Sequence, residues 1–161
     1  MNNHPKVDFV KSKKVSFINL LSVLVLLGTI IYIAIIYPSL PDRIPTHFNM
    51  AGEADGWGGK NSILIFPFIA IITYIPLYYV SKAPHTFNYT VTITEENAPR
   101  IYPVAQYYMS LFNLETMILL CIAGVESAMG GMALGFLFFP IVMGVYLVTL
   151  IFFMVKLSRL K

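Results

Sequence analysis

Four long apolar stretches alternate with short polar segments along this chain of 161 residues. The stretches cover about residues 16–37, 63–80, 105–125 and 132–155. At 1.5 Å per residue in a helix, each can cross a hydrocarbon core of roughly 30 Å, the second only just. The pattern therefore predicts a single integral membrane domain over residues 1–161, an all-α bundle of four transmembrane helices.

The composition supports a membrane protein. Hydrophobic residues make up 57% of the chain and charged residues 12%, and the mean hydropathy is +0.72. Ordinary soluble domains carry about 25% charged residues, roughly twice this share. The excess of apolar residues excludes a soluble domain, because only a lipid bilayer can cover it. The one cysteine, Cys121, lies within an apolar stretch, so the chain has no intrachain disulfide and we expect no cofactor bound through cysteine or otherwise.

Lys and Arg residues outside the apolar stretches are distributed unevenly. Nine lie in the N-terminal tail, the 81–104 connection and the C-terminal tail, whereas the 38–62 connection holds only Arg43 and Lys60. Because basic residues concentrate on the cytoplasmic side of multi-pass proteins, we expect both termini in the cytoplasm and segment 38–62 outside. The net charge of +3 then reflects topology, and no nucleic-acid partner is expected, since the basic residues form no patch on a soluble domain.

The cytosolic connection 81–104 contains a stretch with a period of two. Apolar Phe87, Tyr89, Val91 and Ile93 alternate with polar residues. This alternation predicts a short extended segment with one apolar face. The segment either pairs with another strand, which its unpaired backbone groups favour, or lies on the membrane surface.

The outer connection 38–62 combines three prolines at its start with four glycines near its end. Prolines restrict the backbone and glycines permit tight turns, so we expect a structured Pro/Gly-rich loop and not a flexible linker. The loop holds nearly all the outward-facing chemistry. The residues that we select as partner-binding are His47, Phe48, Asp55, Trp57 and Lys60.

Two other interpretations of this loop stay open. His47, Glu53 and Asp55 are weak candidates for a metal site, because one imidazole and two carboxylates suit zinc or manganese. Alternatively, the polar side chains only cap turns and pair with Arg43 and Lys60, while the tryptophan anchors the loop at the membrane interface.

Glu115 lies in the third apolar stretch, and none of the four stretches contains Lys, Arg or His. Ionisable groups at such depth are candidates for proton relays or counter-charges, so Glu115 and its neighbour Asn113 form an intramembrane candidate site. In the alternative, a protonated Glu115 hydrogen-bonds Asn113, Tyr74, Tyr146 or Thr149 and serves helix packing. No set of side chains has the pattern of a catalytic site, so we expect no enzyme activity.

Residues 38–60 read PSLPDRIPTHFNMAGEADGWGGK. They fit the pattern P-x-x-I-P-x-H-[FW]-x-x-x-G-x-x-D-x-[WY]-x-x-K at Pro41, Ile44, Pro45, His47, Phe48, Gly52, Asp55, Trp57 and Lys60. With FNYTVTITEENAPRIY at residues 87–102, this resembles a bacterial membrane domain, domain of unknown function 1648. That domain also forms the N-terminal part of SdpI-type immunity proteins. The resemblance implies a bacterial plasma membrane and immunity to a secreted killing peptide, while the further C-terminal membrane segment of SdpI-type proteins finds no counterpart here.

We therefore expect a small bacterial multi-pass membrane protein, immunity-like or receptor-like, that recognises an extracytoplasmic peptide or envelope partner through its outer loop. The alternatives are a transporter or accessory subunit that uses Glu115 for proton or cation handling, and a structural subunit of a membrane complex. The expected partners are the lipid bilayer and a secreted peptide or another membrane protein. Gly131-x-x-x-Gly135, at the start of the fourth stretch, also leaves a homo-oligomer open.

Overall fold

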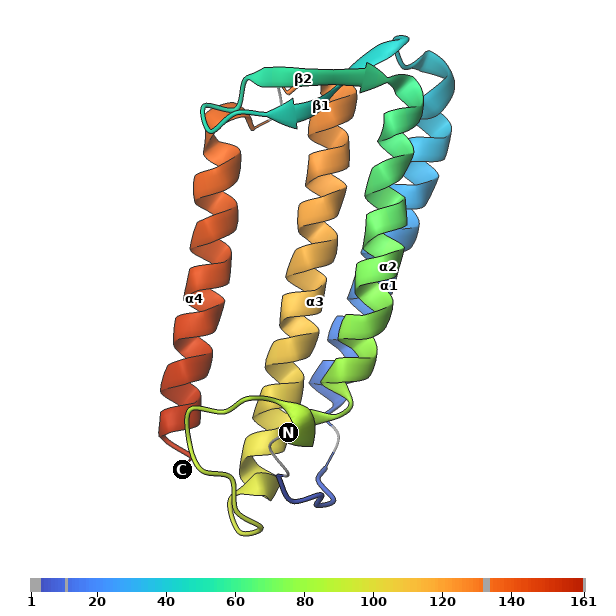
Figure 1. Cartoon of the computed structure of the whole chain (residues 1–161). Helices are drawn as coiled ribbons and strands as arrows, with labels where there is room; N and C mark the ends of the chain where they lie inside the picture. Colours follow the sequence, from blue (N-terminus) through green and yellow to red (C-terminus); the bar gives the residue numbers. More distant parts are fainter. Residues whose placement is uncertain (1–3, 11, 132–133, 161) are drawn as a thin grey trace.

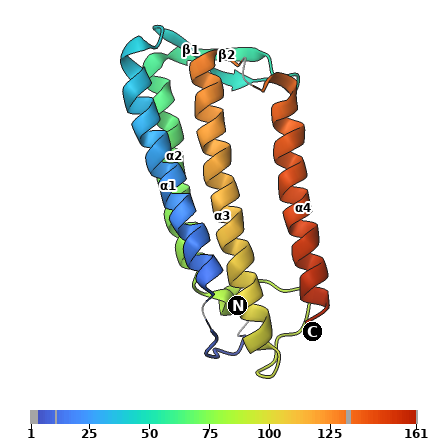
Figure 2. The ribbon, with the colours of Figure 1, turned by 180° about the vertical axis from the view of Figure 1, so that it is seen from behind.

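Four helices run side by side, and a β-hairpin lies across one end of the bundle (Figure 1). The computed structural model describes residues 4–10, 12–131 and 134–160. The helices are α1 (Lys13–Ile36), α2 (Ile65–Ser81), α3 (Ala98–Met129) and α4 (Phe138–Ser158). The strands are β1 (Arg43–Phe48) and β2 (Ala54–Gly59), and short 3-10 turns cover Tyr37–Ser39, Lys60–Leu64, Pro84–Thr86 and Gly135–Leu137. Both chain ends lie at the end of the bundle away from the hairpin (Figures 1 and 2).

All four helices are long and apolar enough to cross a membrane, which confirms the predicted four-span helical fold. The third helix begins at Ala98, seven residues before the predicted start of its span, and its first turns bury Ala98, Ile101 and Tyr102. The predicted start of the fourth span, Met132, lies outside the described residues, and α4 itself begins at Phe138. The protein is a multi-pass membrane protein in contact with a lipid bilayer.

The helix α3 is the centre of the bundle. It contacts α1, α2 and α4 along its length and buries twelve residues. By contrast, α4 packs chiefly on α3, and its one buried residue is Leu157 (Figure 2). The long apolar side chains of α4 are exposed along its whole length, as expected of a helix that faces lipid.

The segment 86–94 does not form a strand, so of the two alternatives the pairing with a second strand is wrong for the described chain. Its apolar face is real: Tyr89, Val91 and Ile93 pack against Tyr102 of α3 and Leu157 of α4. This cluster covers the helix ends near the termini and buries the Tyr89 ring, and burial raises the pKa of the Tyr89 hydroxyl. Tertiary packing, and not a strand partner, holds the segment in place.

The Pro/Gly-rich connection forms an antiparallel β-hairpin, whereas the sequence predicts a structured loop without regular strands. Residue pairs run from Arg43 opposite Gly59 to Phe48 opposite Ala54. Asn49 closes the turn, since its Oδ1 accepts the backbone N–H groups of Ala51 and Glu53 at 2.9 and 3.0 Å.

Buried contacts of the first strand, β1, fix the hairpin to the bundle. Ile44 is 1% exposed and packs with Ile33 and Ile63 of the neighbouring helices. The hydroxyl of Ser127, near the end of α3, donates a hydrogen bond to the carbonyl oxygen of Pro45 at 2.5 Å. One strand face is therefore anchored, and the other is left free.

The two glycines of the Gly131-x-x-x-Gly135 pattern lie before α4, so they are not part of a transmembrane helix seam. Instead Gly131 and the backbone of Gly135 lie directly against the hairpin. A Cβ on Gly131 would lie 2.4 Å from a ring carbon of Phe48, and a Cβ on Gly52 would lie 2.2 Å from the carbonyl carbon of Gly135. Only residues without a side chain allow the hairpin to approach this closely.

Replacing Gly131 should therefore loosen the hairpin. Gly131 has φ +80°, where a side chain costs about 1–2 kcal/mol before any clash with Phe48 is counted. We expect Gly131→Ala to lower the thermal midpoint of the protein in detergent, followed by the fluorescence of Trp57. The matched control is Gly144→Ala in α4, where a Cβ meets nothing within 4 Å. Equal midpoints for wild type and Gly131→Ala would contradict the close packing described here.

Candidate functional site

The free face of the hairpin carries an imidazole, a carboxylate and an indole on adjacent strands. His47 Nδ1 lies 2.5 Å from Asp55 Oδ1, and the two side chains are 71% and 45% exposed. Trp57 is 52% exposed and follows on the same strand as Asp55. The structure thus brings together three of the five residues that the sequence selects as partner-binding.

Glycines in β2 create the space for this arrangement. A Cβ on Gly56 would lie 2.8 Å from the Cβ of His47, and one on Gly58 would lie 2.8 Å from Thr46. The pairing register shifts between Pro45 and His47, which leaves Thr46 as an extra residue in β1. The alternating glycines of ADGWGG are the sequence signal of this close strand pairing, and sequence reasoning assigned them only to turns.

Phe48 and Lys60 lie away from the exposed pair. Phe48 turns toward Gly131 at the membrane side of the hairpin. Lys60 Nζ lies 5.3 Å from the centre of the Tyr37 ring, a cation–π contact near the start of the 3-10 turn Lys60–Leu64. The five selected residues therefore form an exposed group of three and two anchoring side chains.

The alternative interpretations of the loop fare differently. In residues 4–10, 12–131 and 134–160, the His47–Asp55 contact is the only pairing of a basic with an acidic side chain, so neither Arg43 nor Lys60 pairs with a loop carboxylate. Glu53 does not join that pair, because its Oε2 accepts a hydrogen bond from Asn49 Nδ2 at 3.0 Å. Across the described part of the chain, no group of three His, Cys, Asp or Glu side chains could hold a metal ion.

A cavity of about 220 Å³ lies beneath the hairpin, between β1 and the ends of three helices. Its lining residues are Thr46, His47, Phe48, Gly52, Phe66, Ala123, Glu126, Gly135, Phe138 and Phe139. Glu126 is 5% exposed, and its Oε1 accepts the backbone N–H of Leu134 at 2.5 Å. The sequence did not select Glu126 as a site residue, because nothing along the chain places the end of α3 under a hairpin 80 residues earlier.

The two intramembrane candidates point to different neighbours. Glu115 Oε1 accepts a hydrogen bond from the hydroxyl of Thr149 in α4 at 2.5 Å, while its Oε2 is buried without a partner. Asn113 instead faces α2, where its Nδ2 lies 3.5 Å from the carbonyl oxygen of Tyr74. Glu115 and Asn113 therefore do not form one site, and of the four partners proposed for Glu115 the structure places Thr149 against it.

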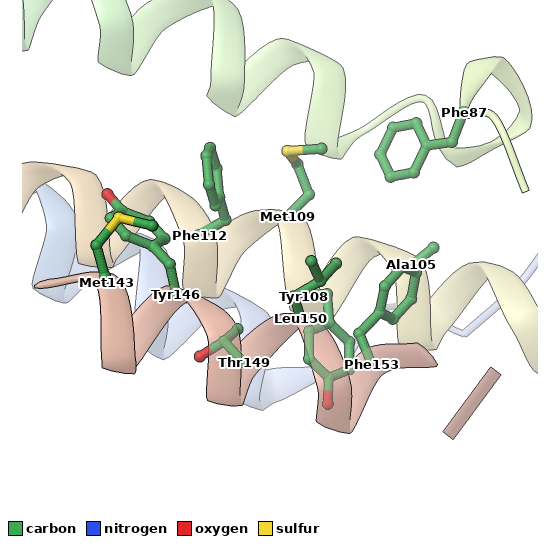
Figure 3. Close-up of a pocket in the computed structure, with 10 residues that line it drawn as sticks. All are labelled: Phe87, Ala105, Tyr108, Met109, Phe112, Met143, Tyr146, Thr149, Leu150 and Phe153. Atoms are coloured by element: carbon green, nitrogen blue, oxygen red, sulfur yellow. The ribbon is translucent and has the colours of Figure 1, made fainter. Parts of the chain in front are cut away.

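A second cavity, of about 540 Å³, lies along the groove between α3 and α4 (Figure 3). Its lining is almost wholly apolar and consists of Phe87, Ala105, Tyr108, Met109, Phe112, Met143, Tyr146, Thr149, Leu150 and Phe153. Thr149 in this wall is the donor to Glu115, which is not itself one of the lining residues. The groove offers hydrocarbon contacts along its length and few polar groups that would select a ligand.

Comparisons with known proteins agree with the resemblance seen in the loop. Residues 24–71 match the family model described as Domain of unknown function (DUF1648), from within α1 through the hairpin to within α2. A protein described as uncharacterized from Archaeoglobus fulgidus is 28% identical over 149 residues, which cover 81% of this chain and 80% of the relative. No solved structure matches the chain. The resemblance to domain of unknown function 1648 is confirmed, and function has to be argued from the geometry.

The exposed pair should contribute little to folding. Double-mutant cycles on exposed ion pairs give about 0.2–1 kcal/mol, because water and salt screen the charges. We expect His47→Ala, Asp55→Ala and the double variant to show a coupling of no more than about 1 kcal/mol in unfolding experiments. A coupling of several kcal/mol would mean that the pair is a structural element of the hairpin and not a free surface.

Proposed function

We propose that this protein is a receptor-like or immunity-like membrane module whose hairpin lies outside the cell and binds a peptide or an envelope partner. The observation that carries the proposal is the exposed face with His47, Asp55 and Trp57 on a hairpin anchored to the bundle. These side chains are available to a ligand, and tryptophan is among the residues that contribute most at binding surfaces.

Anchoring supports binding. A ligand that meets a hairpin held by Ile44 and by the Ser127 hydrogen bond pays little to order it. The helices then act as a scaffold that fixes the position of the binding face relative to the membrane. We propose a binding role and no catalysis, since in the described chain no hydroxyl or thiol forms a hydrogen bond with the His47–Asp55 pair.

The charge distribution supports the orientation. The hairpin connection holds two basic residues, whereas nine lie in the tails and the connection at the other end. By the positive-inside rule, this distribution supports cytoplasmic termini and a hairpin outside the plasma membrane. The immunity role draws further support from the resemblance of residues 38–60 to the N-terminal part of SdpI-type proteins, which implies protection against a secreted peptide.

A protection experiment tests this proposal. A peptide-sensitive bacterial host would produce the protein and be exposed to the secreted peptide fraction of the source organism. We expect the wild-type protein to raise the peptide dose that the host survives. We expect His47→Ala and Asp55→Ala each to lower that dose at least tenfold relative to wild type. Asp42→Ala is the matched control, since Asp42 is an exposed carboxylate of the same connection outside the hairpin pairs.

Membrane levels of every variant have to be equal, as checked by immunoblot. Unchanged protection by both His47→Ala and Asp55→Ala would overturn recognition through this face. Absence of protection by the wild-type protein would overturn the immunity role.

A second candidate function is proton or cation handling by a transporter or accessory subunit, and Glu115 supports it. Its Oε2 is buried without a hydrogen-bond partner. Because burying an ionisable side chain in a membrane helix costs free energy, such a residue is a candidate for function. The Thr149 hydrogen bond holds the side chain toward α4 and the apolar groove.

Reconstituted vesicles test this candidate. With a pH-sensitive dye inside, we expect a pH-dependent flux that Glu115→Gln abolishes, because the amide cannot exchange the proton. Glu53→Gln, a carboxylate substitution on the exposed hairpin turn, should leave the flux unchanged. A flux that survives in Glu115→Gln, or no flux in the wild type, would eliminate the transporter function.

A further inference from the structure

We propose that the cavity beneath the hairpin receives a lysine side chain of the peptide that the hairpin binds, with Glu126 as its counter-charge. This assignment rests on the proposed function, and it names the ligand chemistry of the same site. His47 belongs to both the exposed face and the cavity lining, so a peptide on the hairpin can place one side chain inside.

The size of the cavity suits a single side chain. At about 30 Å³ for each water-sized group, 220 Å³ holds roughly seven heavy atoms. A lysine side chain has five. A helix about 10 Å across takes up roughly 120 Å³ per residue, so the same space would hold less than two residues of helix.

Glu126 supplies the charge. It is 5% exposed and lies near the end of α3, and no Lys or Arg in the described residues forms an ion pair with it. A buried carboxylate is stable only when charged or polar partners replace water. The N–H of Leu134 provides one hydrogen bond to Oε1, and a carboxylate can accept several more.

Because Leu134 already occupies one oxygen, the carboxylate favours a lysine over an arginine. The planar guanidinium of arginine pairs best with both oxygens of a free carboxylate, whereas an ammonium acts as a compact charge that needs one. The Glu126 geometry thus selects the shape of the cation as well as its sign.

Aromatic rings complete the site. Phe48, Phe66, Phe138 and Phe139 line the cavity together with Glu126. Ring faces attract an ammonium group, by about 0.5–2 kcal/mol, and they also cover the apolar stem of a lysine. A cavity that joins four phenylalanines to one carboxylate matches a chain that is apolar along its length and positive at its tip.

The hairpin end of the molecule as a whole is acidic, in contrast to the net charge of +3. Asp42, Glu53, Asp55 and Glu126 lie there, against Arg43 and Lys60. The resulting field speeds the encounter of cationic ligands with this end, and because salt screens exposed charges, a single exposed carboxylate adds little to it.

Fluorescence of Trp57, the only tryptophan, provides the test, because it lies on the strand beside the cavity. The protein would be reconstituted in nanodiscs of phosphatidylglycerol and titrated with acetyl-Gly-Gly-Lys-Gly-Gly-amide. The same peptide with norleucine in place of lysine keeps the stem and removes the ammonium. We expect saturable binding of the lysine peptide, at least tenfold weaker binding of the norleucine peptide, and a similar loss in Glu126→Gln.

Three variants separate charge from folding. Glu126→Gln keeps a carbonyl oxygen for the Leu134 N–H, so the hairpin should stay docked and the free-protein spectrum of Trp57 should not change. Ala123→Leu fills the cavity without altering charge and should also weaken binding, whereas Glu53→Gln, on the exposed turn, should not. Equal binding of the two peptides, no binding of either, or full binding by Glu126→Gln would overturn the lysine assignment.

A lipid headgroup is the competing source of an ammonium. If nanodiscs with phosphatidylethanolamine abolish binding of the lysine peptide to the wild-type protein, the headgroup occupies the cavity and the peptide assignment is overturned. The outcomes also separate this inference from the proposed function. If His47→Ala removes protection while Glu126→Gln keeps both protection and peptide binding, recognition by the hairpin stands and the lysine site does not.

Discussion

The docking of the hairpin onto the bundle end is the constraint on which the rest of the structure depends. Ile44 fills a buried position among Ile33 and Ile63, and Ser127 fixes the strand backbone at Pro45. A two-stranded hairpin is marginally stable alone, so these contacts with the helices are what keep it ordered. Close approach is possible because Gly52 and Gly131 carry no side chain where the hairpin meets the α3–α4 connection.

Docking also divides the hairpin into two faces with different chemistry. The anchored face encloses a small cavity with Phe48 and Glu126, while the free face presents His47, Asp55 and Trp57. The two are connected through His47, which lies at their boundary. The exposed face and the cavity lining thus share one element, the hairpin between Arg43 and Gly59.

Within the helix bundle, the contact between α3 and α4 contains the carboxyl of Glu115. Glu115 accepts a hydrogen bond from Thr149 across the α3–α4 contact, where Leu157 is the one buried residue of α4. Glu115 Oε2 is buried without a hydrogen-bond partner, and the apolar groove between α3 and α4 lies beside this contact. Because Glu115 and Glu126 lie on the same helix, three turns apart, α3 links the intramembrane carboxyl to the hairpin site.

The sequence by itself determined the four spans, since a run of about 20 apolar residues has one stable solution in lipid, a helix with all its backbone hydrogen bonds made internally. It also marked His47, Asp55 and Trp57, because charged and aromatic residues are conspicuous in a connection between such spans. It could not place Glu126 or Phe138 beside the same cavity as His47. It also could not show that Gly131 and Gly135 contact the hairpin and not a neighbouring helix. Those contacts join segments some 80 residues apart, and local patterns carry no information about them. Only the tertiary structure decided that the end of α3, the start of α4 and the hairpin meet around one cavity, because side-chain packing among separate segments sets that geometry.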